Sequence, residues 1–184
     1  MKYLLVGLGN PGSEYDQTRH NIGFEVLDEL AKTKEVQWES VKHGWRTEVS
    51  HKGRKLILIK PSTYMNLSGK AVSYWLQQEK LDKQQLLVVL DDLSMELGKL
   101  RIRPKGSDAG HNGLKNIAEV LGTVDYPRLK VGIGNDFPKG RQVEFVLGRW
   151  SEEEQATINL SKDVAISMIK QYVFDQKPTS GSVD

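Results

Sequence analysis

The sequence predicts an α/β fold: a single-domain, largely parallel mixed sheet with helices on both faces. Strand-like runs alternate with helical patterns along most of the chain, and no internal repeat interrupts them. The run at 86–90 is continuously apolar, as in a strand buried on both faces of a parallel sheet. With 184 residues, 38% of them hydrophobic, the chain suits one core. We expect one catalytic domain over residues 1–176 and a disordered tail over 177–184.

The first half of the chain is expected to contain four strands and two helices. The strands are predicted at residues 3–6, 44–50, 55–60 and 86–90. The first helix is predicted over 21–32, after a glycine-rich turn at 7–12. Ser68 is the expected N-cap of the second helix.

The second half is predicted to contain two further strands and two further helices. Strands are expected at 99–103 and 128–134, and helices at 112–121 and 151–174. Gly122 terminates the shorter helix, and Ser151 with Glu154 has the spacing of a capping box for the longer one.

Ligands of open α/β sheets bind outside the carboxyl ends of the strands. The loops that follow Val6, Lys60, Leu90 and Arg103 all leave from predicted strand ends. If these strands are parallel, the four loops share one edge of the sheet.

Composition limits the possible chemistry. The chain has no cysteine, which excludes disulfides, thiolate zinc sites and a cysteine nucleophile. It contains no run of 18 apolar residues, and Gly7 interrupts the first apolar run too early for a signal peptide, so we expect a cytoplasmic protein. A net charge of +2 does not indicate a nucleic-acid binder by itself, so local clusters must decide that point.

The turn at 7–12 has the Gly-x-Gly-x-x-Gly spacing of dinucleotide-binding folds. Pro11 removes a backbone donor, and the helix begins several residues too late to receive a pyrophosphate. The acidic residue that would hold a ribose is also missing. Two readings stay open: a purely structural turn, or a loop that presents the Asn10 amide to a substrate.

His20 is the leading candidate for proton transfer, although a lone histidine is more often structural. It needs a partner that fixes its tautomer, and Asp91 at the end of the central strand is the first choice. Asp92 ranks second. Only one of the two should face His20, because successive strand residues point opposite ways. A solvated strand end explains Asp91-Asp92 equally well on local grounds.

Asn66 and Asn112 place two further amides near predicted helix starts, where capping is the alternative reading. Amides suit neutral hydrogen bonding to a carbonyl or an oxyanion. The chain has no Gly-x-Ser-x-Gly elbow, and its histidines show no metal-ligand spacing, so we predict no essential metal. Water activated by His20 is the simplest remaining nucleophile.

Basic residues alternate with apolar ones in the strand at 99–103. Lys99, Arg101 and Arg103 would share one face, and Lys105 and Lys130 would extend it. RNA phosphates are one possible ligand, and a solvated face is the other reading.

Four motifs together resemble the bacterial peptidyl-tRNA hydrolase family over residues 2–147. They are VGLGNPG at 6–12, TRHNIG at 18–23, YMNLSG at 64–69 and GHNGLK at 110–115. The resemblance implies a monomeric α/β enzyme that cleaves the ester between a peptide and the terminal ribose of tRNA. This reaction recycles tRNA from prematurely released peptidyl-tRNA. The resemblance implies no cofactor, no membrane and no obligate protein partner.

The resemblance also assigns roles to individual residues. His20 is implied as the general base and Asp91 as its orienting carboxylate. Asn10 and Asn66 are implied to bind near the scissile ester, and Asn112 to position water or the peptide backbone. The remaining implied contacts are cleft-lining by Tyr15 and Met65, a clamp on the tRNA 5′-phosphate by Arg103 and Lys130, and an acceptor-arm contact by His111.

The chain departs from the family pattern at three places. Ser94-Met95 replaces an acidic and an apolar residue, and the loop at 106–110 has fewer glycines than usual. The C-terminal segment lacks the usual aromatic-asparagine sequence, which leaves a C-terminal tRNA contact open.

Overall fold

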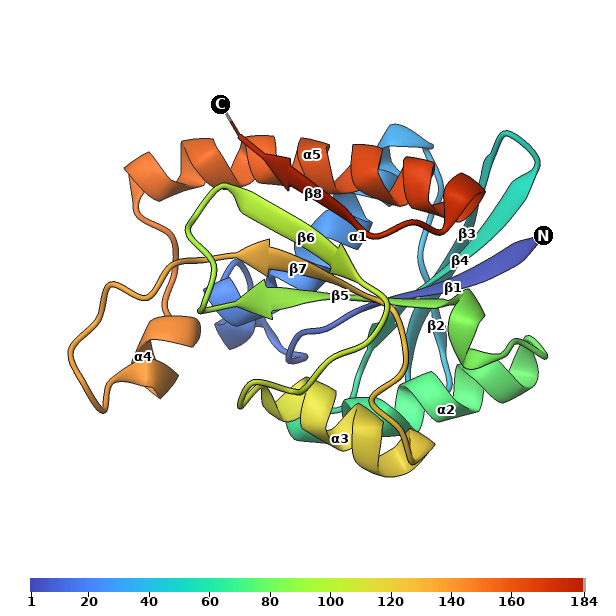
Figure 1. The fold of residues 1–184 in the computed structure, drawn as a ribbon, viewed down its shortest axis with the longest axis horizontal. Helices are drawn as coiled ribbons and strands as arrows, with labels where there is room; N and C mark the ends of the chain where they lie inside the picture. The colour runs from blue at the N-terminus through green and yellow to red at the C-terminus, as the bar shows by residue number, and fades with distance from the viewer. Residues whose placement is uncertain (184) are drawn as a thin grey trace.

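A mixed eight-stranded sheet forms the centre of the molecule, seen in a computed structural model that describes residues 1–183 (Figure 1). The strand order is β2-β3-β4-β1-β5-β7-β6-β8. The strands are β1 (Lys2–Gly7), β2 (Glu39–Val41), β3 (Gly44–His51), β4 (Arg54–Pro61), β5 (Leu86–Asp92), β6 (Lys99–Arg103), β7 (Arg128–Gly132) and β8 (Thr179–Ser182). The four central strands β4, β1, β5 and β7 are parallel, which confirms the predicted fold class.

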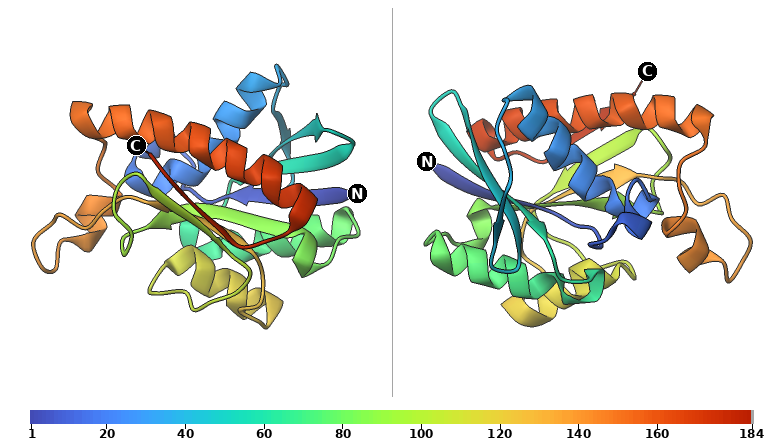
Figure 2. Two further views of the ribbon diagram at one scale, coloured as in Figure 1. Left: turned by 45° about the horizontal axis from the view of Figure 1, so that its top comes forward. Right: turned by 180° about the vertical axis from the view of Figure 1, so that it is seen from behind.

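Helices cover both faces of the sheet (Figures 1 and 2). One face carries α1 (Ile22–Thr33) and α5 (Glu152–Asp175), and the other carries α2 (Ser68–Gln78) and α3 (Asn112–Leu121). The remaining helical segments are α4 (Gln142–Val146), η1 (Ser13–Tyr15), η2 (Arg19–Asn21), η3 (Met65–Leu67) and η4 (Lys83–Gln85).

Two apolar layers result from the alternation of side chains along the central strands. In β1, Leu5 packs into the layer under α1 and α5, whereas Leu4 and Val6 pack into the layer under α2 and α3. Both faces of β1 are therefore buried, as its apolar sequence requires.

Glycines allow α1 to lie close against the sheet. A Cβ added to Gly23 would lie 2.4 Å from the carbonyl oxygen of Val89, and one added to Gly7 would lie 2.3 Å from that of Gly23. These distances leave no room for a side chain at either position. The first glycine of the 7–12 motif therefore serves helix–strand packing, and this close approach brings η2 next to the end of β5.

Three expectations from the sequence need correction. The tail predicted to be disordered over 177–184 includes β8, which pairs with β6 in antiparallel fashion; Asp184 lies outside the described residues. Strand β6 is itself antiparallel to β7, so the loop after Arg103 leaves the opposite edge of the sheet. Ser68 is not an N-cap: Leu67 precedes the helix, and the Ser68 hydroxyl donates to the carbonyl of Met65 at 2.7 Å.

Among residues 1–183, no helix is both long and apolar enough to cross a membrane.

Candidate active site

The candidate site lies where the parallel strands end. Because β1, β4, β5 and β7 run the same way, the segments that follow them leave from one edge. Three of the four motifs lie there: VGLGNPG and TRHNIG in the segment after β1 that includes η2, and YMNLSG in the segment after β4 that includes η3. The end of β5 lies beside them. The start of α3 joins them from the face of the sheet that carries α2 and α3.

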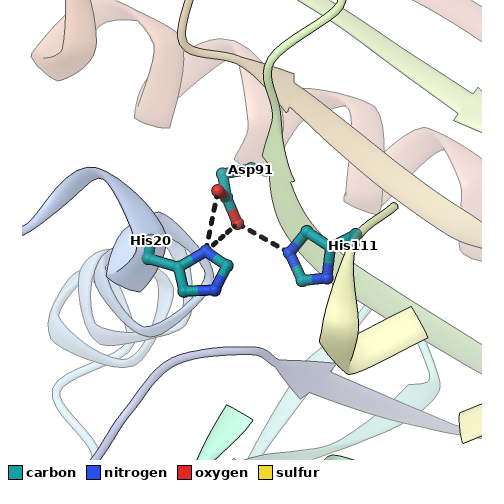
Figure 3. Close-up of side chains that lie close together, drawn as sticks. All are labelled: His20, Asp91 and His111. Carbon is teal, nitrogen blue, oxygen red and sulfur yellow. Dashed lines mark hydrogen bonds and ion pairs between the residues drawn. The ribbon is translucent and has the colours of Figure 1, made fainter. Parts of the chain in front are cut away.

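His20 and Asp91 are in direct contact. The Nδ1 atom of His20 lies 2.9 Å from Oδ2 of Asp91 and 3.1 Å from Oδ1. An ionised carboxylate only accepts hydrogen bonds, so Nδ1 carries the ring proton and Nε2 of the neutral ring is free to accept another. Figure 3 shows this second nitrogen of His20 pointing away from Asp91. Asp92 turns elsewhere and pairs with Lys130 at 3.4 Å, as strand alternation requires.

His111 is a second histidine on the same carboxylate (Figure 3). Its Nε2 lies 2.9 Å from Oδ1 of Asp91. Its Nδ1 accepts the backbone N–H groups of Gly113 at 3.1 Å and Leu114 at 3.4 Å, so His111 is the N-cap of α3. Asn112 is therefore not the cap. Because Nδ1 accepts, the proton of the neutral ring is on Nε2 and is donated to Asp91. Both ring nitrogens are therefore engaged within the protein. The predicted contact of His111 with an acceptor arm stays a prediction.

Burial and charge have opposite effects on the pKa values of Asp91 and His20. Burial alone would raise the pKa of Asp91, but its interactions with His20 and His111 outweigh burial and hold the pKa well below the usual range. Burial alone would lower the pKa of His20, but the charge of Asp91 and the hydrogen bond to it raise the pKa above its ordinary value. The carboxylate thus stays ionised, and Asp91 favours the protonated form of His20 more than burial opposes it.

The same three side chains are the one group among residues 1–183 with the composition of a metal site. Their ligand atoms all lie within 4.8 Å of one another. A metal needs an unprotonated nitrogen from each histidine. His111 could offer Nε2 only by moving its proton to Nδ1, which would break the cap on α3. The arrangement fits a hydrogen-bonded carboxylate better than a bound cation.

Asn10 is held by two residues, Met65 at its side chain and Asn21 at its backbone. Its Oδ1 accepts the backbone N–H of Met65 at 2.7 Å, which leaves the Nδ2 donors for a ligand. Its own backbone is clamped by Asn21, whose side chain accepts the Asn10 N–H at 2.8 Å and donates to the Asn10 carbonyl at 2.9 Å. Asn21 did not emerge as a site residue from the sequence, although its position beside His20 in TRHN was a usable signal.

Asn66 and Asn112 lie in η3 and at the first position of α3, with exposed side chains. The two segments touch, because a Cβ added to Gly113 would lie 2.8 Å from Sδ of the buried Met65. Tyr15 stands edge-on to Tyr64, with ring centroids 6.4 Å apart. The predicted amides and Tyr15 are therefore gathered at the same edge as His20.

The predicted cations share one face of neighbouring strands. Arg101 is directly opposite Lys130, and Arg103 is opposite Arg128. Leu100 and Ile102 are buried on the other face, as the alternation predicted. Arg128 was overlooked: it is 1% exposed, and its guanidinium donates to the carbonyls of Gly106, Ser107, Val124 and Tyr126. It fastens the start of the loop that leads to His111.

A cavity of about 250 Å³ opens beside the Asp91 pair. His20, Asp91, His111 and Asn112 line its polar side, and α4 contributes Val143 and Val146 to an apolar side. A histidine held by a buried carboxylate, next to amides at the carboxyl edge of a parallel sheet, defines an α/β enzyme equipped for proton transfer.

Comparison with known proteins identifies the family. The family model for peptidyl-tRNA hydrolase matches residues 4–181. The peptidyl-tRNA hydrolase of Porphyromonas gingivalis is 54% identical over 172 residues, covering 94% of this chain and 93% of the relative. That of Cytophaga hutchinsonii is 57% identical over 155 residues, covering 84% and 82%. A crystal structure of the Acinetobacter baumannii peptidyl-tRNA hydrolase matches with a TM-score of 0.88 at 36% identity, covering 95% of this chain and 89% of that one. The chain belongs to the peptidyl-tRNA hydrolase family.

Proposed function

We propose that this chain hydrolyses the ester bond between the peptide and the 3′-terminal ribose of peptidyl-tRNA. The observation that carries the mechanism is the 2.9 Å contact between Nδ1 of His20 and Asp91, which leaves Nε2 of His20 unprotonated. Nε2 takes a proton from water, and the resulting hydroxide attacks the ester carbonyl carbon. Collapse of the tetrahedral intermediate breaks the bond to the ribose oxygen, which receives the proton from His20. The products are a peptide carboxylic acid and tRNA with a free terminal hydroxyl.

Neutral donors are proposed to stabilise the oxyanion. Asn10 is the first candidate, because Met65 holds its Oδ1 and its Nδ2 group has no partner among residues 1–183. Asn66 is proposed to bind the substrate near the ester, and Asn112 to position the water or the peptide backbone. An amide donor suits this task because it stabilises negative charge without lowering the basicity of His20 as a cation would.

His111 is proposed to orient Asp91. The carboxylate accepts one N–H from each of two rings, and the backbone of α3 fixes the tautomer of His111. Asp91 therefore cannot rotate away from His20 without losing a second hydrogen bond. Tyr15 and Met65 are proposed to line the substrate cleft.

Arg103 and Lys130 are proposed to bind the tRNA 5′-phosphate. They project from the same face of adjacent strands: Lys130 is directly opposite Arg101, two residues before Arg103 in β6. Lys130 also borders the cavity. Replacing either with alanine should raise KM and reduce the dependence of log KM on log salt by about 0.7 to 0.9. An unchanged salt slope would contradict the phosphate contact. We expect low sequence specificity among tRNAs, because phosphate contacts carry no sequence information.

The decisive experiment is release of tRNA from N-acetyl-aminoacyl-tRNA by the wild type, His20→Ala and His43→Ala. His43 is a matched control, because it lies in the turn between β2 and β3, away from Asp91. We expect His20→Ala to lower kcat about 10² to 10⁴-fold and His43→Ala to keep wild-type activity. Full activity of His20→Ala would overturn the mechanism. An inactive wild type that still binds tRNA would indicate an RNA-binding protein without catalysis.

We also propose that the enzyme acts in the cytoplasm as a monomer that needs no cofactor. Light scattering coupled to gel filtration should give a mass near the 20.8 kDa of one chain. A stable mass of twice that value would contradict the monomer.

A further inference from the structure

Arg19 precedes His20 in the chain but points the other way. His20 faces Asp91, whereas the Arg19 guanidinium enters the junction between α4 and α5. There NH1 donates to the carbonyl of Phe145 at 3.1 Å, and NH2 donates to Oε1 of Glu154 at 2.9 Å. The side chain is 12% exposed, so these contacts are largely shielded from water.

The segment around Arg19 is shaped to its guanidinium. The Cζ atom lies 4.2 Å from the centroid of the Phe145 ring and 5.4 Å from that of Trp150. Gly148 leaves the necessary space, because a Cβ there would lie 2.8 Å from NH1 of Arg19. Stacked rings and a carbonyl acceptor select the planar guanidinium over a lysine ammonium.

Glu154 connects this contact to the start of α5. It belongs to the capping box of the helix, in which its Oε1 accepts the backbone N–H of Ser151 at 2.9 Å. The same oxygen accepts from Arg19. One side chain beside the catalytic histidine therefore joins η2, α4 and the first turn of α5.

Helix α4 has little else to hold it. It has five residues, none of them fully buried, and Val143 is 68% exposed. Only half-buried Phe145 and Val146 pack against the apolar layer under α1 and α5, and the Phe145 ring also lies 4.8 Å from that of Phe137 in the preceding loop. A helix this short is not stable by itself. In Figure 1, α4 stands apart from the two helix layers, on an excursion of the chain between β7 and α5. Apart from a local bond from the Arg141 N–H to the carbonyl of Pro138, the hydrogen bonds that join segment 141–148 to the rest of residues 1–183 come from Arg19, through its side chain and its backbone N–H.

We propose that Arg19 is a positioning residue that holds α4 at the rim of the cavity beside Asp91 and thereby sets the affinity for peptidyl-tRNA. Val143 and Val146 of α4 line that cavity together with His20 and His111. When α4 detaches, the apolar wall is lost and substrate binds a partly formed site, so the apparent affinity falls with the population of the attached state. This proposal rests on the proposed function, since it concerns the binding of the same substrate.

The test compares Arg19→Met with Arg149→Met. Arg149 is the matched control: it is exposed, lies in the same region, and makes no side-chain hydrogen bond or ion pair among the described residues. Both variants lose one positive charge, so a general loss of RNA attraction affects them alike. We expect Arg19→Met to raise KM roughly tenfold, equivalent to about 1.4 kcal/mol, with a smaller change in kcat. Arg149→Met should stay within about twofold of the wild type.

Amide hydrogen exchange supplies a readout that does not depend on catalysis. Exchange over 142–148 should accelerate in Arg19→Met and not in Arg149→Met, while the amides of the central strands stay protected. The pH below which kcat falls, here called the acid limb of kcat, should be the same as in the wild type, because Asp91 still holds His20. Equal exchange in both variants, or an unchanged KM in Arg19→Met, would overturn the proposal.

Two further arms keep the test decisive. Should Arg19→Met fail to fold, Glu154→Gln removes the charged partner but keeps an oxygen for the capping box, and it should shift KM and exchange in the same direction by less. No change in either readout for that variant would count against the proposal. A wild type without hydrolase activity would instead refute the proposed function, and the exchange measurement would still decide whether Arg19 holds α4.

Discussion

Replacing Asp91 with asparagine removes a charge from the centre of the site and keeps the shape of the side chain. In the wild type, the carboxylate accepts Nδ1–H of His20 and Nε2–H of His111, each at 2.9 Å. An asparagine has one carbonyl oxygen, and its amide group would turn N–H donors toward one of the rings. At least one histidine would then face a donor instead of an acceptor and lose its orientation.

The expected loss of rate follows from what remains in the variant. A positioned general base contributes about 10² to 10⁴-fold to catalysis. The His20 imidazole is still present in Asp91→Asn, so we expect less than the full loss. A fall in kcat of about 10² to 10³-fold corresponds to roughly 2.7 to 4.1 kcal/mol of transition-state stabilisation.

The pH dependence of kcat gives a separate test with a defined sign. His20 acts as a base only when it is neutral, so activity rises as the pH passes its pKa. In the wild type, Asp91 outweighs burial and raises the pKa of His20. In Asp91→Asn only burial acts, and burial lowers the pKa. The acid limb of kcat should therefore move to lower pH in the variant.

The assay is steady-state hydrolysis of N-acetyl-aminoacyl-tRNA at saturating substrate across pH, with Asp92→Asn as the matched control. Asp92 is the next residue along β5, but its carboxylate pairs with Lys130 and not with a histidine. Its variant should keep the wild-type acid limb. An Asp91→Asn enzyme whose limb does not move, or whose kcat falls less than about fivefold, would refute the role of Asp91 as the orienting group.

Three further predictions follow from contacts at and around the site. Asn21→Ala removes both hydrogen bonds to the Asn10 backbone and should lower kcat about tenfold, as measured with the same substrate. Gly23→Ala places a Cβ 2.4 Å from the Val89 carbonyl and should destabilise the fold by more than about 2 kcal/mol in urea unfolding. The pKa of Asp91 is lower in the folded state than in the unfolded state, so the stability that its charge contributes is present above the unfolded pKa and is lost as the pH falls. The free energy of unfolding of the wild type should therefore approach that of Asp91→Asn as the pH is lowered from about 5 to about 3.

Each of these has a control in the chain. Gly53→Ala should cost only about 1 kcal/mol, because Gly53 has a positive φ but nothing within 4 Å of an added Cβ. Equal destabilisation by the two glycine variants would contradict the packing argument. Asn21→Asp keeps the oxygen that accepts the Asn10 N–H and should lose less activity than Asn21→Ala. A stability difference that does not change with pH would mean that Asp91 does not titrate differently in the folded state.

Local pattern was sufficient to predict much of the fold and to name His20 and Asp91 as the leading candidates for the site, with Asp92 as the second choice of carboxylate. The continuous apolar run before Asp91 indicated the central strand, because a strand covered on both faces is apolar at every position and a run this short favours a strand over a helix. Alternation then settled that one of the two carboxylates faces His20, and the structure places Asp91 there. The capping box at Ser151 and the glycine after α3 correctly marked helix ends, because capping depends only on residues within one turn of the helix end.

Strand direction and the weak strand β8 escaped prediction. The sequence of β6 alternates in the same way whether its partner is parallel or antiparallel, so the path of the chain after Arg103 could not be derived. The residues of β8, Thr-Ser-Gly-Ser, have little strand propensity. Their backbone hydrogen bonds with β6 stabilise the extended conformation that the local sequence does not favour.

By itself, the sequence determined the α/β class, the central strand and the set of polar residues that follow strand ends. These features depend on the apolar periodicity of residues that are close together in the chain. Tertiary structure alone decided which of those residues meet. His111 is 20 residues from Asp91 and Arg19 is 135 from Glu154, and no local pattern encodes contacts at such separations. The close packing of α1 on the sheet and the N-cap of α3 bring two histidines to one carboxylate, and that convergence turns separate polar residues into a site.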